Sequence, residues 1–341
     1  MINVLQVIYS NAIRYELLAN MTKLAFNGYD DINLNIYIDL YPIFRTLLKP
    51  DYLDLNSDVD LCSGVLNLAA HYRRFFERYC DTKTNIFIIN SMNTPMRNAK
   101  TFEGYNKEFM HRYNTRTTKM NEIINLNLSL LETLVPYIPD VYMISSTYES
   151  SVVMYDIINK HSNGYPNLII SRDIYPRQLP AILDKTILYR PKLDKSYYVD
   201  SKNVFNSILF EHGVKCSKYN FSGINPKLFS LFYTLNGMKC RNIKSQYVVS
   251  TAKKHVEKAI ENKIILNDYN SIIDWSSIQS KRDPELLDSI FQVIDIPLQH
   301  SIYVNDIESK YNLQNLYDPE SVKAINNTYF THNNQINLND F

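Results

Sequence analysis

The feature that most limits the possible folds is an alternation of short apolar runs with longer helical patterns over the first 190 residues. Helical spacing of apolar residues occupies 58–80, 123–134 and 150–160. Between and beside these segments lie β-branched runs typical of buried strands, at 36–40, 85–90, 141–144, 168–170 and 186–189. Parallel strands need crossover helices of this kind, so the order predicts an α/β fold with a mainly parallel sheet.

The rest of the chain has helical patterns and polar ends. Beyond residue 203, apolar residues recur at helical spacing over 204–210, 226–235, 246–260 and 283–293. Residues 3–26 predict a leading helix or two, and 326–341 are too polar to support a core. We therefore expect four parts: a helical extension at 1–30, an α/β domain at 31–200, a helical region at 201–325 and a polar tail at 326–341.

Composition narrows the classes of partner and compartment. A net charge of +1 excludes a strongly basic surface, so any contact with nucleic acid would depend on a local patch. The four cysteines show neither zinc spacing nor a disulfide framework, and no apolar run reaches membrane-spanning length. We expect a cytoplasmic protein of a reducing compartment, without membrane contact. Only 7 Gly against 27 Tyr is typical of AT-rich genomes, such as those of many phages and other viruses.

Acidic residues follow two of the expected strands. Asp39 ends the first run and Asp173 follows the fourth, and the carboxyl ends of parallel strands meet at one edge of a sheet. Glu149 opens the helical pattern at 150–160. A metal site is one interpretation of these acids. The structural alternatives are a turn cap or a pair with Arg45 for Asp39, a pair with Arg172 or Arg177 for Asp173, and a contact with the helix dipole for Glu149.

Six short motifs resemble, in the same order, those of the 5′-nuclease or flap-endonuclease superfamily. They lie at 38–45 (IDLYPIFR), 88–97 (IINSMNTPMR), 104–107 (GYNK), 149–152 (ESSV), 171–179 (SRDIYPRQL) and 236–243 (NGMKCRNI). The resemblance implies a PIN-like three-layer sandwich, with an arch-like segment at about 96–120 and a helix-hairpin-helix-like region that clamps duplex. It also implies Mg²⁺ or Mn²⁺ as the cofactor of an active member.

The departures from the family pattern bear on catalysis. Asp39, Glu149 and Asp173 keep an acid and are the candidate metal ligands. At the other carboxylate positions of the family this chain has Asn90, Ser151, Val152, Tyr175, Met238 and Arg241. Two divalent cations about 3.5–4 Å apart need a dense cage of carboxylates, and an arginine there repels a cation. We therefore interpret the three acids as vestigial and expect no cofactor.

Two basic stretches are candidate contacts for nucleic acid. Basic residues interleaved with aromatic ones can follow a phosphate backbone and stack bases, although a solvated helical face would have the same composition. The candidate residues are Arg97, Lys100, Lys107, Arg112, Arg116 and Lys119 in the arch-like segment, and Lys239, Arg241 and Lys244 in the clamp-like region.

The leading interpretation is a catalytically inactive 5′-nuclease-like protein of a virus or phage, which binds branched or single-stranded DNA or a protein partner. One alternative is an active Mg²⁺- or Mn²⁺-dependent 5′-nuclease with a reduced metal site, in which Asp140 or Asp156 assists the three acids. Another is a structural interaction platform that binds no nucleic acid. The tail, with Gln335, Leu338 and Phe341, is a candidate docking peptide for a protein partner.

Overall fold

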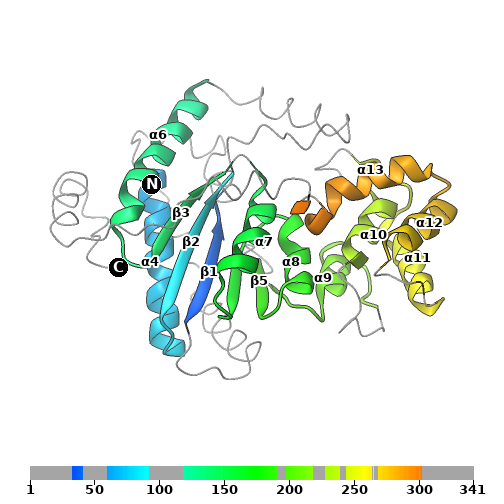
Figure 1. Ribbon diagram of the computed structural model, residues 1–341, viewed down its shortest axis with the longest axis horizontal. Helices are drawn as coiled ribbons and strands as arrows, with labels where there is room; N and C mark the ends of the chain where they lie inside the picture. The colour runs from blue at the N-terminus through cyan, green and yellow to red at the C-terminus, as the bar shows by residue number, and fades with distance from the viewer. Residues whose placement is uncertain are drawn as a thin grey trace.

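A six-stranded sheet forms the centre of the molecule (Figure 1). The computed structural model describes residues 33–40, 60–91, 118–146, 148–190, 197–217, 227–238, 243–262, 264, 268–298 and 300–301. The strands are β1 (Leu34–Asp39), β2 (Thr84–Asn90), β3 (Val141–Ser145), β4 (Asn167–Ile170), β5 (Thr186–Arg190) and β6 (Tyr197–Val199). Their spatial order is β3-β2-β1-β4-β5-β6.

The order of the strands reverses direction next to β1. The chain moves outward from β1 to β2 and β3 on one side, then returns to place β4 and β5 on the other. β1 pairs in parallel with both β2 and β4, and among the described strands only the short β6 is antiparallel to its neighbour. Ligands of open α/β sheets bind outside the carboxyl ends of the strands at such a reversal. The carboxyl ends of β1 and β4 are therefore the expected place for a ligand site.

Helices cover both faces of the sheet. α4 (Asp60–Cys80) and α6 (Thr118–Leu134) pack on one face, and α7 (Ser150–His161) and α8 (Leu179–Ile182) lie toward the helical region on the other (Figure 1). Side chains of a strand alternate between the faces. Accordingly, Ile36 and Ile38 belong to the core beneath α4, whereas Tyr37 belongs to the core beneath α7. The expected three-layer α/β architecture is confirmed.

The helical region extends from the α7 side of the sheet. It consists of α9 (Val204–Glu211), α10 (Lys227–Asn236), α11 (Val249–Glu261), α12 (Tyr269–Ser280) and α13 (Pro284–Ile294). α10 and α11 form a helix-hairpin-helix arrangement, and the main chains of Met238 and Ile243 bond to each other between them. Gly237 has φ 76° there, and an added Cβ would lie 2.5 Å from the backbone nitrogen of Ser245. Only glycine therefore suits this turn.

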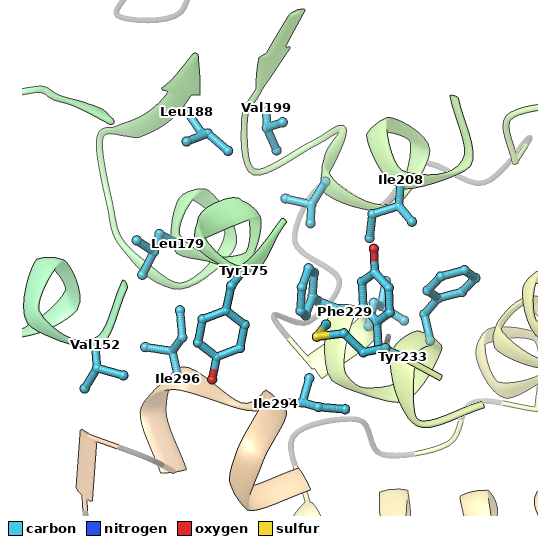
Figure 2. Close-up of a cluster of buried hydrophobic side chains, with 14 of the residues drawn as sticks. Val152, Tyr175, Leu179, Leu188, Val199, Ile208, Phe229, Tyr233, Ile294 and Ile296 are labelled. Carbon is cyan, nitrogen blue, oxygen red and sulfur yellow. The ribbon is translucent and has the colours of Figure 1, made fainter. Parts of the chain in front are cut away.

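One hydrophobic core joins the sheet to the helical region. Figure 2 shows Tyr175 between α8 and the end of α13, with its ring directed toward α13. The Tyr175 hydroxyl donates to the carbonyl of Val293 at 3.0 Å. Gln178 donates to the Ile294 carbonyl at 2.9 Å and accepts from the Ile296 amide at 3.1 Å. The turn after β4 is thus bonded directly to the end of α13.

The sequence pattern predicted most of the described elements to within a few residues. It missed the four-residue α8, the three-residue β6 and the helix α12, and it began α11 at 246 although the helix begins at Val249. The amides of Gln246 and Tyr247 instead donate to the carbonyl of Leu235, which folds them into the hairpin. The predictions for 3–26, for 96–117 of the arch-like segment and for 326–341 lie outside the described residues. Of the helices that are described, none is long and apolar enough to cross a membrane.

Candidate functional site

Asp39 and Asp173 lie at the carboxyl ends of neighbouring strands, as predicted. Asp39 is the last residue of β1, and Asp173 follows β4, whose register places Ile170 beside Ile38. Ser171 connects the two acids, because its hydroxyl donates to Asp39 Oδ2 at 2.7 Å and accepts from the Asp173 amide at 3.1 Å. Asp173 Oδ1 in turn accepts from the Ile174 amide at 2.6 Å. Both carboxylates therefore have hydrogen-bond partners from their own chain, and Asp173 caps the turn after β4, a role that the sequence analysis did not assign to it.

Glu149 joins this pair from the next layer. It is the N-cap residue of α7, and its carbonyl accepts from the amides of Val152 and Val153. Burial raises the pKa of the Glu149 carboxyl well above its usual value, and the nearby carboxylates of Asp173 and Asp39 raise this pKa further. The three acids therefore do converge, and Glu149 is favoured in its neutral form.

Four residues that stand where the resembled family has carboxylates are buried in the interior. Val152 and Tyr175 belong to the hydrophobic core that the sheet shares with the helical region, and Figure 2 shows both side chains there. Ser151 is also buried. Asn90 at the end of β2 donates to Ser145 Oγ at 3.0 Å, and Ser145 donates to Glu132 of α6. These side chains now have structural contacts instead of the open carboxylates that a two-metal site requires.

The described residues do not fit a metal centre. Within the ranges that the structure describes, no group of three or more His, Cys, Asp or Glu side chains could hold a metal ion. The chemistry of the acids agrees, since a metal ligand must be ionised and accessible. Asp39 is buried and accepts from the Ser171 hydroxyl, and Asp173 accepts from the Ile174 amide, so both acids are already bonded within the chain.

Two further acids considered as helpers lie elsewhere. Asp140 directly precedes β3, at the amino edge of the sheet, where its Oδ2 lies 3.6 Å from Lys83 Nζ. Asp156 is fully buried within α7, and its Oδ1 lies 2.7 Å from both Lys160 Nζ and His300 Nε2. Asp156 ties α7 to the segment after α13. The suggestion that either residue assists a metal site is therefore wrong.

A group of arginines beside the acids was missed by the sequence reasoning. Arg177 does not pair with Asp173 as the sequence suggested, because it is fully buried and forms an ion pair with Glu211 of α9. Arg190, the last residue of β5, pairs with the same glutamate. Arg172, which directly precedes Asp173, is partly exposed and lies near enough to Arg190 for its charge to lower the pKa of the Arg172 guanidinium, after the larger effect of burial. The arginine that ends the strand sequence TILYR could have indicated a basic residue at this edge of the sheet. Its pairing with Glu211 could not have been predicted, because no local pattern connects the two residues.

Few of the predicted nucleic-acid contacts fall on described residues. Lys244 is exposed in the hairpin between α10 and α11, and Lys119 lies in the first turn of α6. Met238, at another position where the resembled family has a carboxylate, is buried in the hairpin. The other candidates are outside the described residues: Arg97, Lys100, Lys107, Arg112, Arg116, Lys239 and Arg241.

The burial of Glu149 predicts a pH-dependent stability. A carboxyl whose pKa is raised on folding holds its proton in the folded state after the unfolded chain has released it. The stability that Glu149 contributes is therefore complete below about pH 4.3, the unfolded pKa of Glu, and falls as the pH rises toward the higher folded pKa. Glu149→Gln should thus stabilise the protein more at pH 8 than at pH 4.5. Urea unfolding of both proteins at the two pH values measures this, and an equal difference at both would contradict it.

Comparison with known proteins identifies the architecture. No protein-family model and no curated protein sequence matches the chain. Among solved structures, a bacteriophage T5 protein co-crystallised with metal ions aligns with a TM-score of 0.53 and 15% identity, over 81% of this chain and 96% of that one. A pseudo-enzyme–product complex of bacteriophage T5 flap endonuclease with DNA and metal ions aligns with a TM-score of 0.52 and 14% identity, over 81% and 92%. The sheet order, the helical region and these alignments together show that the chain has a 5′-nuclease-like fold.

Proposed function

We propose that the chain is a catalytically inactive 5′-nuclease-like protein that binds nucleic acid. The observation that carries this proposal is the packing of Val152 and Tyr175. Both stand where the resemblance has metal-binding carboxylates, and both are built into the hydrophobic core. A side chain in that environment cannot ligate a metal, and the remaining acids have contacts within the chain. The scaffold therefore remains without the dense carboxylate cage of two-metal catalysis.

Binding of nucleic acid is supported by the architecture and by the basic residues. The T5 flap endonuclease of similar fold was crystallised with DNA. Here the α10–α11 hairpin presents the exposed Lys244, with Lys239 and Arg241 in the same loop of the sequence. We propose branched or single-stranded DNA as the ligand. We also propose a viral or phage origin, on the composition and on the phage proteins of similar fold, and we retain the four-part division with boundaries near 30, 200 and 325.

A reduced metal-dependent nuclease is the second candidate. The convergence of Asp39, Glu149 and Asp173 favours it, because a bound divalent cation would stabilise the ionised form of all three. This candidate requires Mg²⁺ or Mn²⁺. It also requires the Ser171 hydroxyl to move away from Asp39, so that the Asp39 carboxylate can bind the metal ion.

A nuclease assay beside a binding assay separates the two candidates. We expect the purified protein to leave 5′-flap and nicked duplex DNA intact with either Mg²⁺ or Mn²⁺, and to bind the same DNA with an affinity that falls as salt rises. Metal-dependent cleavage that Asp173→Ala abolishes would overturn the proposal of inactivity. The absence of binding even at low ionic strength would overturn the proposal of nucleic-acid binding, and the interaction platform would replace it.

A further inference from the structure

The hairpin between α10 and α11 is held from outside by the residues that follow α12. α10, α11 and α12 lie together at one end of the molecule (Figure 1). Arg282 Nη1 donates to the Thr234 carbonyl at 3.2 Å, and Arg282 Nη2 donates to the Lys244 carbonyl at 2.6 Å. Thr234 lies in the last turn of α10, and Lys244 lies in the chain that returns toward α11. A single guanidinium therefore joins the two sides of the hairpin.

The main chain of Arg282 is fixed on both sides. Its amide donates to Ser280 Oγ at 3.3 Å, and its carbonyl accepts from Ser277 Oγ at 2.8 Å. Lys281, the residue before it, ends α12 in the left-handed conformation with φ 55°, and its amide donates to the Ser277 carbonyl at 2.7 Å. The guanidinium therefore extends toward the hairpin from a main chain that has little freedom to move.

The bond to Thr234 also satisfies part of the open end of α10. The last carbonyls of a helix have no partner within the helix, and a cation near them is stabilised by the helix dipole. Arg282 supplies such a cation to the Thr234 carbonyl. The next carbonyl, that of Leu235, accepts from the amides of Gln246 and Tyr247, each at 3.1 Å. Arg282 thus adds a charged donor, which forms stronger hydrogen bonds than a neutral one, to the bonds that fold the hairpin back onto α10.

This attachment requires an arginine. Arg282 is half-buried, which lowers the pKa of its guanidinium, and within the described residues no carboxylate pairs with it. Main-chain carbonyls are its partners instead. The planar guanidinium presents donors at a fixed spacing, whereas lysine has one ammonium group at the end of a flexible stem. A lysine would keep the charge, but it would not hold both carbonyls in the same geometry.

A second set of contacts attaches the start of α11 to the same end of α12. The Tyr247 hydroxyl donates to the carbonyl of Gln279. The Nδ1 atom of His255 in α11 lies 2.8 Å from Gln279 Oε1, and the ring centroids of Tyr247 and His255 are 4.7 Å apart. The end of α12 therefore contacts both the returning chain of the hairpin and the helix that follows it, while the side chain of Lys244 remains exposed.

We propose that Arg282 is a positioning residue for nucleic-acid binding, which holds the two sides of the α10–α11 hairpin in the arrangement that contacts DNA without touching the DNA itself. The inference rests on the proposed function, in which the hairpin presents its basic residues to nucleic acid. In the sequence, Lys239 and Arg241 lie between the residues whose carbonyls Arg282 binds, so its bonds fix both ends of the segment that carries them. Without these bonds the hairpin would adopt the binding arrangement for a smaller fraction of the time, and the affinity would fall by that fraction.

Salt-titrated binding of 5′-flap DNA in EDTA tests the proposal. The variants are Arg282→Gln, which removes both bonds and the charge, and Arg282→Lys, which keeps the charge. The matched control is Arg73→Gln, because Arg73 also donates to a main-chain carbonyl, that of Pro139 at 2.7 Å, but at the amino edge of the sheet. Thermal unfolding sets a binding temperature at which the variants are folded, and Arg282→Lys alone carries the comparison if Arg282→Gln does not fold. Hydrogen exchange of the Gln246 and Tyr247 amides reports on the hairpin in the absence of DNA.

We expect both Arg282 variants to bind about tenfold more weakly than the parent, because the competent fraction of the hairpin falls. The slope of log affinity against log salt should stay within about 0.3 of the parent slope, because no phosphate contact is lost. Exchange at Gln246 and Tyr247 should become faster in both variants. Arg73→Gln should lose stability but keep the affinity, the slope and the exchange of these amides.

Three results would overturn the positioning role. A slope that flattens by about 0.9 in Arg282→Gln, with the parent affinity in Arg282→Lys, would mean that Arg282 contacts a phosphate directly. Parent affinity or parent exchange in both Arg282 variants, or an equal loss of affinity in Arg73→Gln, would also overturn it and leave the proposed function intact. The absence of binding by the parent even at low salt would overturn both.

Discussion

Val152→Asp should lower the thermal stability of the protein sharply and should restore no nuclease activity. Val152 is fully buried in the first turn of α7, within the core that the sheet shares with the helical region. A carboxylate there has no water and must be protonated or force the helix to move, at a cost of about 3 kcal/mol or more. Because each kcal/mol shifts the melting temperature by about 2–4 °C in a chain of this general size, a fall of about 6–12 °C is expected.

The matched control is Val152→Asn, which has the shape of Asp without its charge. Asn should also destabilise the protein, but equally at pH 5 and pH 8. The penalty of Asp should grow with pH over this range, because the unfolded carboxyl is ionised while the buried carboxyl keeps its proton. Calorimetry at the two pH values, together with a 5′-flap cleavage assay, measures the result. A Val152→Asp protein that melts within 2 °C of the parent, or that cleaves DNA with Mg²⁺, would show that the position is still open to a metal ligand.

Asp295→Ala should cost about 3–5 kcal/mol of stability, because it leaves a cation with no carboxylate beneath the surface. Asp295 ends α13 and is 1% exposed. Both of its oxygens lie 2.9 Å from Lys227 Nζ at the start of α10, and it also accepts from Ser230 Oγ and the Leu298 amide, each at 3.1 Å. Chemical denaturation of the parent and the variant measures the loss.

A double-variant cycle identifies the source of that loss. Lys227→Met removes the cation and keeps an unbranched apolar side chain, so the protein with both substitutions should be more stable than the sum of the two single effects allows. Two losses that simply add would mean that Lys227 and Asp295 act independently. The ion pair would then contribute nothing of its own to the packing of α10 against α13.

The sequence predicted the sheet better than the helices that follow it. Strands such as β1 are mainly apolar and are buried on both faces, which is typical of parallel strands. α12 was missed because its apolar residues do not form one stripe: Ile278 is 71% exposed, whereas Ser276 and Ser280 are buried. Burial there follows from contacts with α10 and α13, which no local pattern contains.

The candidate site was predictable only in part, for a similar reason. The positions of Asp39 and Asp173 follow from the rule that the carboxyl ends of parallel strands share an edge, and the structure places them there. Two contacts were not predictable: the hydrogen bond from the Ser171 hydroxyl to Asp39, and the ion pair between Arg177 and Glu211 of α9. Each joins residues that are far apart in sequence. The spacing of residues along the chain predicts which face of a helix or strand a side chain occupies. It does not predict which side chain of another element will contact it.

The shared core beneath α7 also has a genetic consequence. Because residues from α9 through α13 complete the core on the α7 side of the sheet, a gene fragment that stops after β5 would leave the core residues of α7 and α8 without much of their cover. Premature stop codons in the last third of the gene should therefore behave as complete loss-of-function alleles and not as partial ones. Removal of the helical half would therefore require another cover for the core residues on that side of the sheet.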